Sequence, residues 1–107
     1  MASVSTHVLD AVTGRPAVGV SVTLSDDAGT TLADGTTDDD GRIGALAADM
    51  AIGTYRIRFD TGAWFAERGV ETFYPEVVVT FRVADSDAHQ HVPILLSPFA
   101  FSTYRGS

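Results

Sequence analysis

This chain has few residues that can carry out acid–base, nucleophilic or metal chemistry. It contains three histidines, and its seven basic residues are all arginine, while cysteine is absent. A cysteine nucleophile and a lysine Schiff base are therefore excluded by composition. A neutral imidazole can act as a base near pH 7. An arginine can bind a carbonyl oxygen or an anion through two parallel hydrogen bonds. The histidines and arginines are thus the candidates for a site.

The histidines fall at the two ends of the chain. His89 and His91 are two residues apart, so in a strand their rings share one face. His7 and His91 have apolar neighbours and are the stronger candidates for acid–base chemistry. His89 directly follows a turn, where we expect an exposed ring or one bonded to local backbone. Three converging imidazoles could instead hold a zinc ion, a different kind of site from the same residues.

Arg42 directly follows the acidic turn at residues 38–41 and opens a predicted strand. At that place a guanidinium could bind a carbonyl or an anion, although Arg42 taken alone is equally consistent with an ordinary exposed arginine. The turn fails as a calcium loop, because Thr36 and Ala47 fall where acidic ligands are required. We interpret it as a solvated turn. The chain shows neither a Gly-x-Ser-x-Gly motif nor a glycine-rich phosphate loop.

The length and charge restrict the class of protein. With 107 residues the chain is expected to form one domain, residues 1–107. Its net charge of −7 argues against a nucleic-acid partner, since binding phosphates needs clustered cations. No apolar run reaches membrane-spanning length, and the first ten residues lack the features of a signal peptide. We therefore expect a cytoplasmic protein without a membrane or nucleic-acid partner.

Alternating apolar and polar residues predict the elements that must position these side chains. The predicted strands cover residues 5–10, 18–24, 30–37, 42–46, 55–59, 77–83, 89–96 and 99–103, and residues 47–53 are predicted to form a loop. Residues 63–68 are typical of a short helix, with Asp60 or Thr61 at its start and Gly69 at its end. Many short strands with a single helix favour an antiparallel β-sandwich of seven to eight strands.

The last predicted long strand has two different faces. Val92, Ile94 and Leu96 point one way and suit a core, whereas His89 and His91 point the other way with a proline and a leucine. A strand that combines a core face with imidazoles and a proline is expected near a sheet edge or an opening. We interpret the tail as both a structural strand and one wall of a site.

Several segments resemble the 5-hydroxyisourate hydrolases, the transthyretin-like proteins of purine catabolism. The resemblance lies in Ser-Thr-His-Val-Leu-Asp at residues 5–10, Asp40-Gly41-Arg42, Phe-Tyr-Pro-Glu at residues 73–76, His89-x-His91-x-Pro93 and the final Tyr104-Arg105-Gly106-Ser107. The final tetrapeptide is the most specific of these, and the match covers essentially the whole chain. Gln90 and Phe101 depart from the family, which more often has Tyr at both positions.

The resemblance implies a transthyretin-like (prealbumin-like) two-sheet fold and a homotetramer, a dimer of dimers with its sites in an interface channel. It implies hydrolysis of 5-hydroxyisourate, with no cofactor and no metal, by attack of water on a ring carbonyl. His7 and His91 would position the water and accept its proton, and Arg42 would stabilise the developing negative charge. Tyr104 and Ser107, from an adjoining subunit, would hold the purine-like ring. The implied catalytic residues are thus His7, Arg42, His91 and Ser107, and the implied substrate contacts are His7, Arg42 and Tyr104.

Two other functions are consistent with the same residues. One is a metal-dependent hydrolase that uses His7, His89 and His91. The other is a non-enzymatic protein of the transthyretin type that binds a small ligand in the interface channel. The histidine–arginine set and the Tyr-Arg-Gly-Ser end favour the enzyme.

Overall fold

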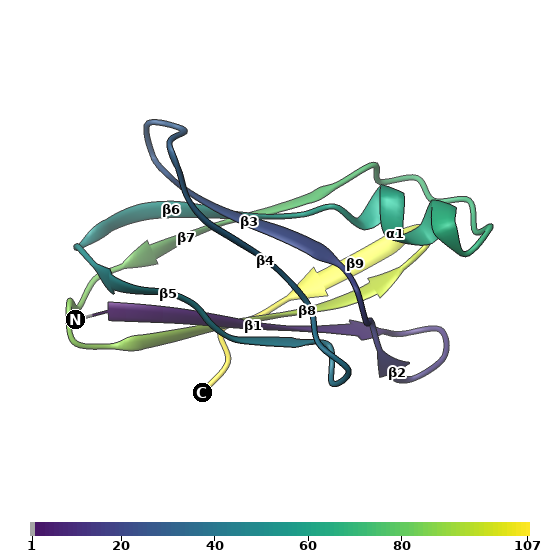
Figure 1. The fold of residues 1–107 in the computed structure, drawn as a ribbon, viewed down its shortest axis with the longest axis horizontal. Helices are drawn as coiled ribbons and strands as arrows, with labels where there is room; N and C mark the ends of the chain where they lie inside the picture. Colours follow the sequence, from purple (N-terminus) through teal and green to yellow (C-terminus); the bar gives the residue numbers. More distant parts are fainter. Residues whose placement is uncertain (1) are drawn as a thin grey trace.

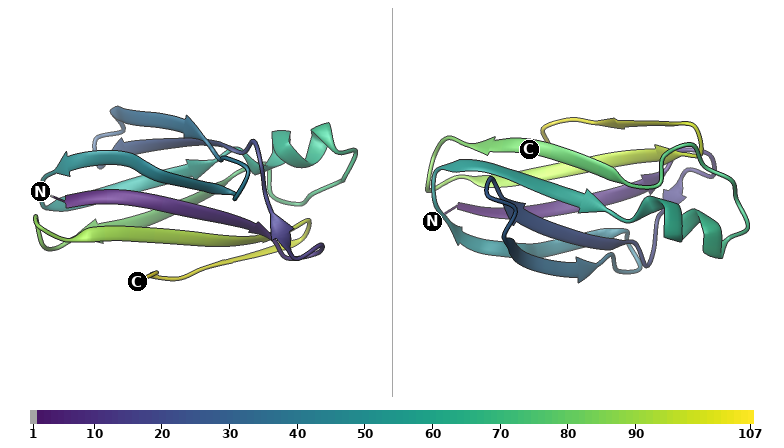
Figure 2. Two further views of the ribbon diagram at one scale, coloured as in Figure 1. Left: turned by 60° about the horizontal axis from the view of Figure 1, so that its bottom comes forward. Right: turned by 90° about the horizontal axis from the view of Figure 1, so that it is seen from above.

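The computed structural model describes residues 2–107 as two β-sheets packed face to face, with one short helix at one end of the sandwich (Figures 1 and 2). The elements are β1 (Ala2–Asp10), β2 (Arg15–Pro16), β3 (Ser21–Asp26), β4 (Thr31–Thr36), β5 (Arg42–Met50), β6 (Gly53–Phe59), α1 (Thr61–Glu67), β7 (Val77–Val83), β8 (His89–Ser97) and β9 (Ala100–Thr103). The predicted all-β sandwich with one helix is confirmed. The helix is far too short to span a membrane, and no other helix occurs in the described chain.

The first sheet carries the candidate residues. Its strand order is β2-β1-β8-β9, and β5 pairs with β1 as well, while the second sheet has the order β4-β3-β6-β7. β1 and β8 run parallel, and the other strand pairs are antiparallel. Alternation within a strand does not reveal the direction of its partner, so the parallel pair is a finding of the structure. It places the N-terminal strand beside the histidine-bearing tail.

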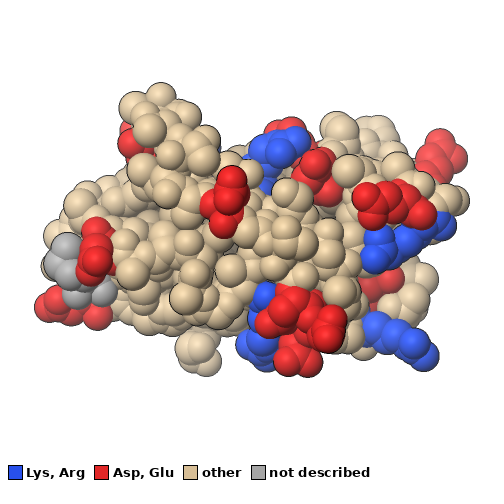
Figure 3. Space-filling model, in the orientation of Figure 1, with Lys and Arg blue, Asp and Glu red and all other residues tan. Residues whose placement is uncertain are grey.

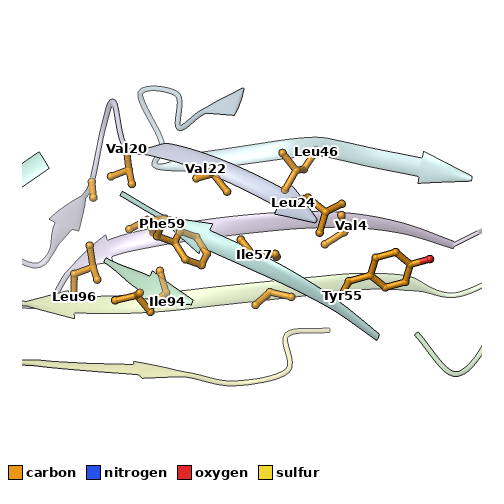
Figure 4. Packing of buried hydrophobic residues seen from close by; sticks show 14 of the residues in the cluster. Val4, Val20, Val22, Leu24, Leu46, Tyr55, Ile57, Phe59, Ile94 and Leu96 are labelled. Atoms are coloured by element: carbon orange, nitrogen blue, oxygen red, sulfur yellow. The ribbon is translucent and has the colours of Figure 1, made fainter. Parts of the chain in front are cut away.

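The core lies between the sheets and explains which side chains face outward. Val4, Thr6 and Val8 of β1 are fully buried, as is Ile94 of β8. Figure 4 shows Val4, Ile94 and Leu96 pointing toward Val22, Leu24, Ile57 and Phe59 of the second sheet. Because side chains alternate along a strand, the odd-numbered residues of β1 and β8 lie on the outer face. The predicted division of β8 into a core face and a histidine face is confirmed.

β5 is longer than predicted. Residues 47–50 continue the strand instead of forming a loop, because they pair with β1 through register shifts near Val4. Asp49 adopts a positive φ of 58° close to these irregularities. The predicted strand at residues 18–24 begins only at Ser21, because Val18 and Gly19 form a turn. The alanines of β5 do not alternate with larger apolar residues, so the sequence carried no strand pattern there. Pairing with β1 makes these residues a strand.

The helix is confirmed, with one correction at its start. Asp60 occupies the N-cap position of α1, but its side chain makes no capping hydrogen bond. The Thr61 hydroxyl is buried and has no hydrogen-bond partner within residues 2–107. The side chain of Arg68 lies 3.8 Å from the centre of the Trp64 ring and donates to the Val18 carbonyl, which docks the helix on the sandwich. Gly69, with φ of 67°, ends it as expected.

Candidate active site

The β1–β5 pair brings His7 and Arg42 together. The two residues are direct partners in the antiparallel register. Side chains that are directly opposite in such a pair share a face, with their Cβ atoms roughly 4.5–5.5 Å apart. Both line an open hollow of about 490 Å³, together with Leu9 and Pro16. The structure therefore places an imidazole and a guanidinium side by side on the outer face of the first sheet.

The turn at residues 38–41 holds Arg42 in this place. Oδ1 of Asp38 accepts hydrogen bonds from the backbone N–H groups of Asp40 and Arg42, each at 2.9 Å. Gly41 has φ of 75°, and its carbonyl accepts a 2.7 Å hydrogen bond from the N–H of Val8, directly after His7. A side chain at Gly41 would clash, because its Cβ would lie 2.4 Å from the Val8 carbonyl oxygen. The sequence pattern predicts only a solvated turn here and carries no signal of this positioning role.

His91 lies on the same face as His7, one strand away. In the parallel β1–β8 register, Ser5 is opposite His91 and His7 is opposite Pro93. His7 and His91 are therefore diagonal neighbours on the outer face. The three candidates that sequence analysis placed far apart in the chain, His7, Arg42 and His91, come from three adjacent strands of one sheet. The structure brings them together.

The surroundings of His91 favour its neutral form. Partial burial lowers the pKa of the imidazole from its usual value near 6.5, and the positive charges of Arg42, His7 and His89 lower it further. A hydrogen bond with the Ser5 backbone acts in the opposite direction but is outweighed. At neutral pH the ring is therefore uncharged and has a lone pair free to accept a proton.

Hydroxyl groups of β1 bind the ring nitrogens of β8. The Ser5 hydroxyl lies 2.7 Å from Nδ1 of His91 and 2.8 Å from Nε2 of His89. Nδ1 of His89 in turn lies 2.5 Å from the Ser3 hydroxyl. His89 is exposed as expected, but its ring bonds to side chains of the neighbouring strand and not to local backbone. The signal for this was Ser-x-Ser at residues 3–5, which only the parallel register connects to His-x-His.

The histidines do not form the metal site considered from the sequence. Within residues 2–107, no three His, Asp or Glu side chains are grouped so that they could hold a metal ion. The Ser5 hydroxyl lies between His89 and His91 and occupies one nitrogen of each ring. The arrangement found is a hydrogen-bonded chain of imidazoles and hydroxyls.

The C-terminal segment folds back over His91 of its own chain. Gly106 forms an antiparallel bridge with His91, and its N–H donates to the His91 carbonyl at 2.9 Å. Tyr104 and Arg105 line a hollow of about 300 Å³ together with His91 and Phe81. Tyr104 is 59% exposed, and Ser107 is also exposed. The segment expected to come from an adjoining subunit thus already flanks His91 within one chain. Figure 2 shows this C-terminal segment running back alongside β8.

Each candidate group therefore has a defined place. His7 and Arg42 line one open hollow, and His91 and Tyr104 line another. The charged side chains on the face shown in Figure 3 are mixed, and its basic groups lie beside acidic ones instead of forming a continuous basic patch. Arg56 pairs with Asp27, and Arg58 pairs with Glu76, in keeping with this distribution. The arrangement can bind a small polar molecule, activate a water and stabilise an oxyanion.

Known proteins share this fold and much of this sequence. The 5-hydroxyisourate hydrolase of Salmonella typhimurium is 47% identical over 96% of this chain and 79% of its own length. That of Caulobacter vibrioides is 43% identical over the full length of both chains. The structure of Klebsiella pneumoniae 5-hydroxyisourate hydrolase superimposes with a TM-score of 0.92 at 43% identity, over 98% of this chain and 99% of that one. Sea bream transthyretin in complex with thyroxine gives 0.91 at 32% identity, over 97% and 94%. The model of the HIUase/Transthyretin family matches residues 4–106, and the chain belongs to that family.

Proposed function

We propose that this protein hydrolyses 5-hydroxyisourate to 2-oxo-4-hydroxy-4-carboxy-5-ureidoimidazoline in urate degradation. Its relatives include hydrolases of that substrate and a transthyretin bound to thyroxine. The observation that carries the choice is the constellation on the outer face of the first sheet. His7 is paired with Arg42, and neutral His91 lies one strand away beneath the C-terminal segment. These groups suit hydrolysis of a cyclic amide.

In the proposed reaction a water attacks a ring carbonyl of the substrate. The water oxygen bonds to the carbonyl carbon, and one water proton passes to the imidazole of His91, with His7 holding the water. Arg42 stabilises the negative charge that develops on the carbonyl oxygen. The amide C–N bond then breaks, the ring nitrogen takes up a proton, and a carboxylic acid remains. Proton transfer of this kind typically contributes about 10²–10⁴-fold. Tyr104 and Ser107 flank the ring as substrate-holding groups.

The proposed active form is a homotetramer, a dimer of dimers. β7 and β9 are the last strands of their sheets, so each has an edge free for another strand within the described chain. Val78 and Phe101 on these strands are exposed apolar residues, as is Phe73 in the loop before β7. Pairing of these edges would form a dimer, and two dimers facing through their first sheets would enclose the histidines in a channel. The proposed location is the cytoplasm, as expected from the composition.

The test is to add the protein to freshly oxidised urate and follow the ultraviolet absorbance of the intermediate. We expect decay faster than the spontaneous rate, and exhaustive chelation should leave that rate unchanged. Loss of rate on chelation, with recovery on adding zinc, would favour the metal-dependent hydrolase. Spontaneous decay at every protein concentration would favour a small-ligand binding protein of the transthyretin type. Light scattering after size-exclusion chromatography tests the tetramer, and Phe101→Glu should weaken it.

A further inference from the structure

Nδ1 of His91 is connected to solvent by a chain of hydrogen bonds. Nδ1 of His91 bonds to the Ser5 hydroxyl, that hydroxyl bonds to Nε2 of His89, and Nδ1 of His89 bonds to the Ser3 hydroxyl. The heavy-atom distances along it are 2.7, 2.8 and 2.5 Å, all within hydrogen-bond range. Ser5 is buried, with 7% of its surface exposed, whereas His89 is exposed. The chain therefore runs from the site to the surface.

This series of hydrogen bonds can hold its protons in two arrangements, here called the first and the second order. A serine hydroxyl has one proton, and a neutral imidazole has one protonated and one free nitrogen. In the first order, His91 donates from Nδ1 to Ser5, Ser5 donates to His89, and His89 donates to Ser3. Nε2 of His91 then has a free lone pair. In the second order every hydrogen bond is reversed, and Nε2 of His91 carries a proton. The two orders differ by one proton moved along the whole chain.

We propose that Ser5, His89 and Ser3 form a proton relay, through which His91 accepts a proton from the attacking water at Nε2 while it releases its own Nδ1 proton toward the surface. Ser5 is the central positioning residue, because its hydroxyl bonds to both rings. This inference rests on the proposed hydrolysis, in which His91 is the base. Nε2 of His91 has no hydrogen-bond partner among the residues that the structure describes, so it is the nitrogen left for water.

The positive groups around His91 explain why a relay would favour the reaction. Arg42 on β5 adds positive charge near the ring, Arg82 and Arg105 line the hollow beside it, and His7 on β1 and His89 on β8 would add to the repulsion whenever they are protonated. A base that became an imidazolium here would be destabilised by these groups. The relay avoids that state, because His91 remains neutral before and after the transfer. Partial burial first, and then the charges of Arg42, His7 and His89, also lower the pKa of His91.

The proton balance closes over one turnover. The water loses one proton to Nε2 of His91 as its oxygen bonds to the carbonyl carbon. One proton moves from each donor to the next, and Ser3 passes its surplus proton to solvent. When the C–N bond breaks, the reverse shift delivers a proton from Nε2 of His91 to the leaving nitrogen and restores the first order. The product retains the second water proton as a carboxylic acid, which ionises in solvent.

The experiment compares the full-length protein with Ser5→Ala, which interrupts the chain, and Ser5→Thr, which keeps a hydroxyl. Ser25→Ala, on the opposite sheet, is the matched control. We expect Ser5→Ala to lower kcat about tenfold, the rate equivalent of one neutral hydrogen bond, and Ser5→Thr to restore most of it. Rates in mixtures of light and heavy water should give a curved plot for the unmodified protein, because several protons move together. That plot should become linear in Ser5→Ala.

A second measurement separates a relay from a merely structural serine. The ¹⁵N shifts of the His91 ring should show Nδ1 protonated in the unmodified protein, and Ser5→Ala should move the proton toward Nε2. An active protein in which Ser5→Ala changes neither kcat nor the ring shifts would overturn the relay. Failure of the unmodified protein to accelerate 5-hydroxyisourate decay would instead overturn the proposed function. Circular dichroism of each variant identifies one that has not folded, and His89→Asn, at an exposed position, then provides the same test.

Discussion

Gly106 lies against the imidazole of His91 so closely that a side chain cannot fit between them. A Cβ built on Gly106 would be 2.4 Å from Cδ2 of His91 and 3.0 Å from Cγ. The C-terminal segment is therefore fitted to the ring that we propose as the base. This contact gives a chemical reason for a glycine next to the last residue of this sequence.

Gly106→Ala should displace the C-terminal segment or turn the His91 ring. We expect at least a tenfold loss of kcat/KM with little change in thermal stability, because the segment lies at the margin of the fold. Gly53→Ala is the control, since its Cβ would meet only Tyr55, at an ordinary 3.8 Å. Initial rates of substrate decay provide the measurement. Equal rates for the two variants would mean that the contact has no part in catalysis.

Gly41→Ala should destabilise the fold and displace Arg42 from His7. The residue has φ of 75°, which alanine disfavours, and the new Cβ would also clash with the Val8 carbonyl. Gly29→Ala is a matched control, since Gly29 has φ of 88° with nothing within 4 Å. We expect each variant to lose roughly 1 kcal/mol from backbone strain, and Gly41→Ala to lose more from the clash. Urea denaturation measures the free energy of unfolding of both variants. Equal losses would contradict the role of this turn in holding Arg42 beside His7.

The pH dependence of activity should reflect the lowered pKa of His91. The base works only when neutral, so kcat/KM should stay constant as pH falls to about 6.5 and decline only below it. Arg42→Gln removes one of the positive charges that lower this pKa and should shift the decline to higher pH, in addition to reducing the rate. A pH–rate profile of each protein is the measurement. If kcat/KM of the unmodified protein had already fallen fully at pH 6.5, the base would not be a His91 with a lowered pKa.

The same shift has a consequence for stability, and its sign can be stated. The unfolded chain binds a proton at His91 more readily than the folded chain does, because the folded pKa is the lower one. Stability from this group is therefore intact above pH 6.5 and is lost as pH falls from there through the folded pKa. His91→Gln should remove this part of the acid sensitivity. Unfolding free energies measured across that range test it, and an unchanged acid sensitivity in the variant would contradict it.

Two buried threonines should respond in opposite ways to the same substitution. Thr61→Val removes a hydroxyl that has no hydrogen-bond partner within residues 2–107, so we expect about 1 kcal/mol of stabilisation. Thr6→Val removes a hydroxyl that donates to the Val92 carbonyl at 2.6 Å, so we expect about 1 kcal/mol of destabilisation. Urea denaturation of both variants provides the comparison. Destabilisation by Thr61→Val would show that its hydroxyl is satisfied in solution.

The sequence predicted the strands in which apolar and polar residues alternate strongly. It failed where a segment is a strand only because it pairs with a neighbour. Residues 77–83 and 89–96 alternate clearly and form β7 and β8 as expected. Residues 47–50 have mostly small side chains, and only their contact with β1 makes them a strand. For the site, resemblance to a family supplied His7, Arg42 and His91 together, because spacing cannot reveal which strands are neighbours. Ser5 was missed for the same reason, since its partner His91 is known only from the parallel register.

In the proposed reaction His91 is the base for the attack of water on 5-hydroxyisourate. The most direct measurement is the rate of decay of that intermediate with the unmodified protein and with His91→Gln at equal concentration and pH 7.5. We predict acceleration by the unmodified protein and a loss of about 10²–10⁴-fold in the variant, with its fold retained. Full activity in a folded His91→Gln protein would contradict the account.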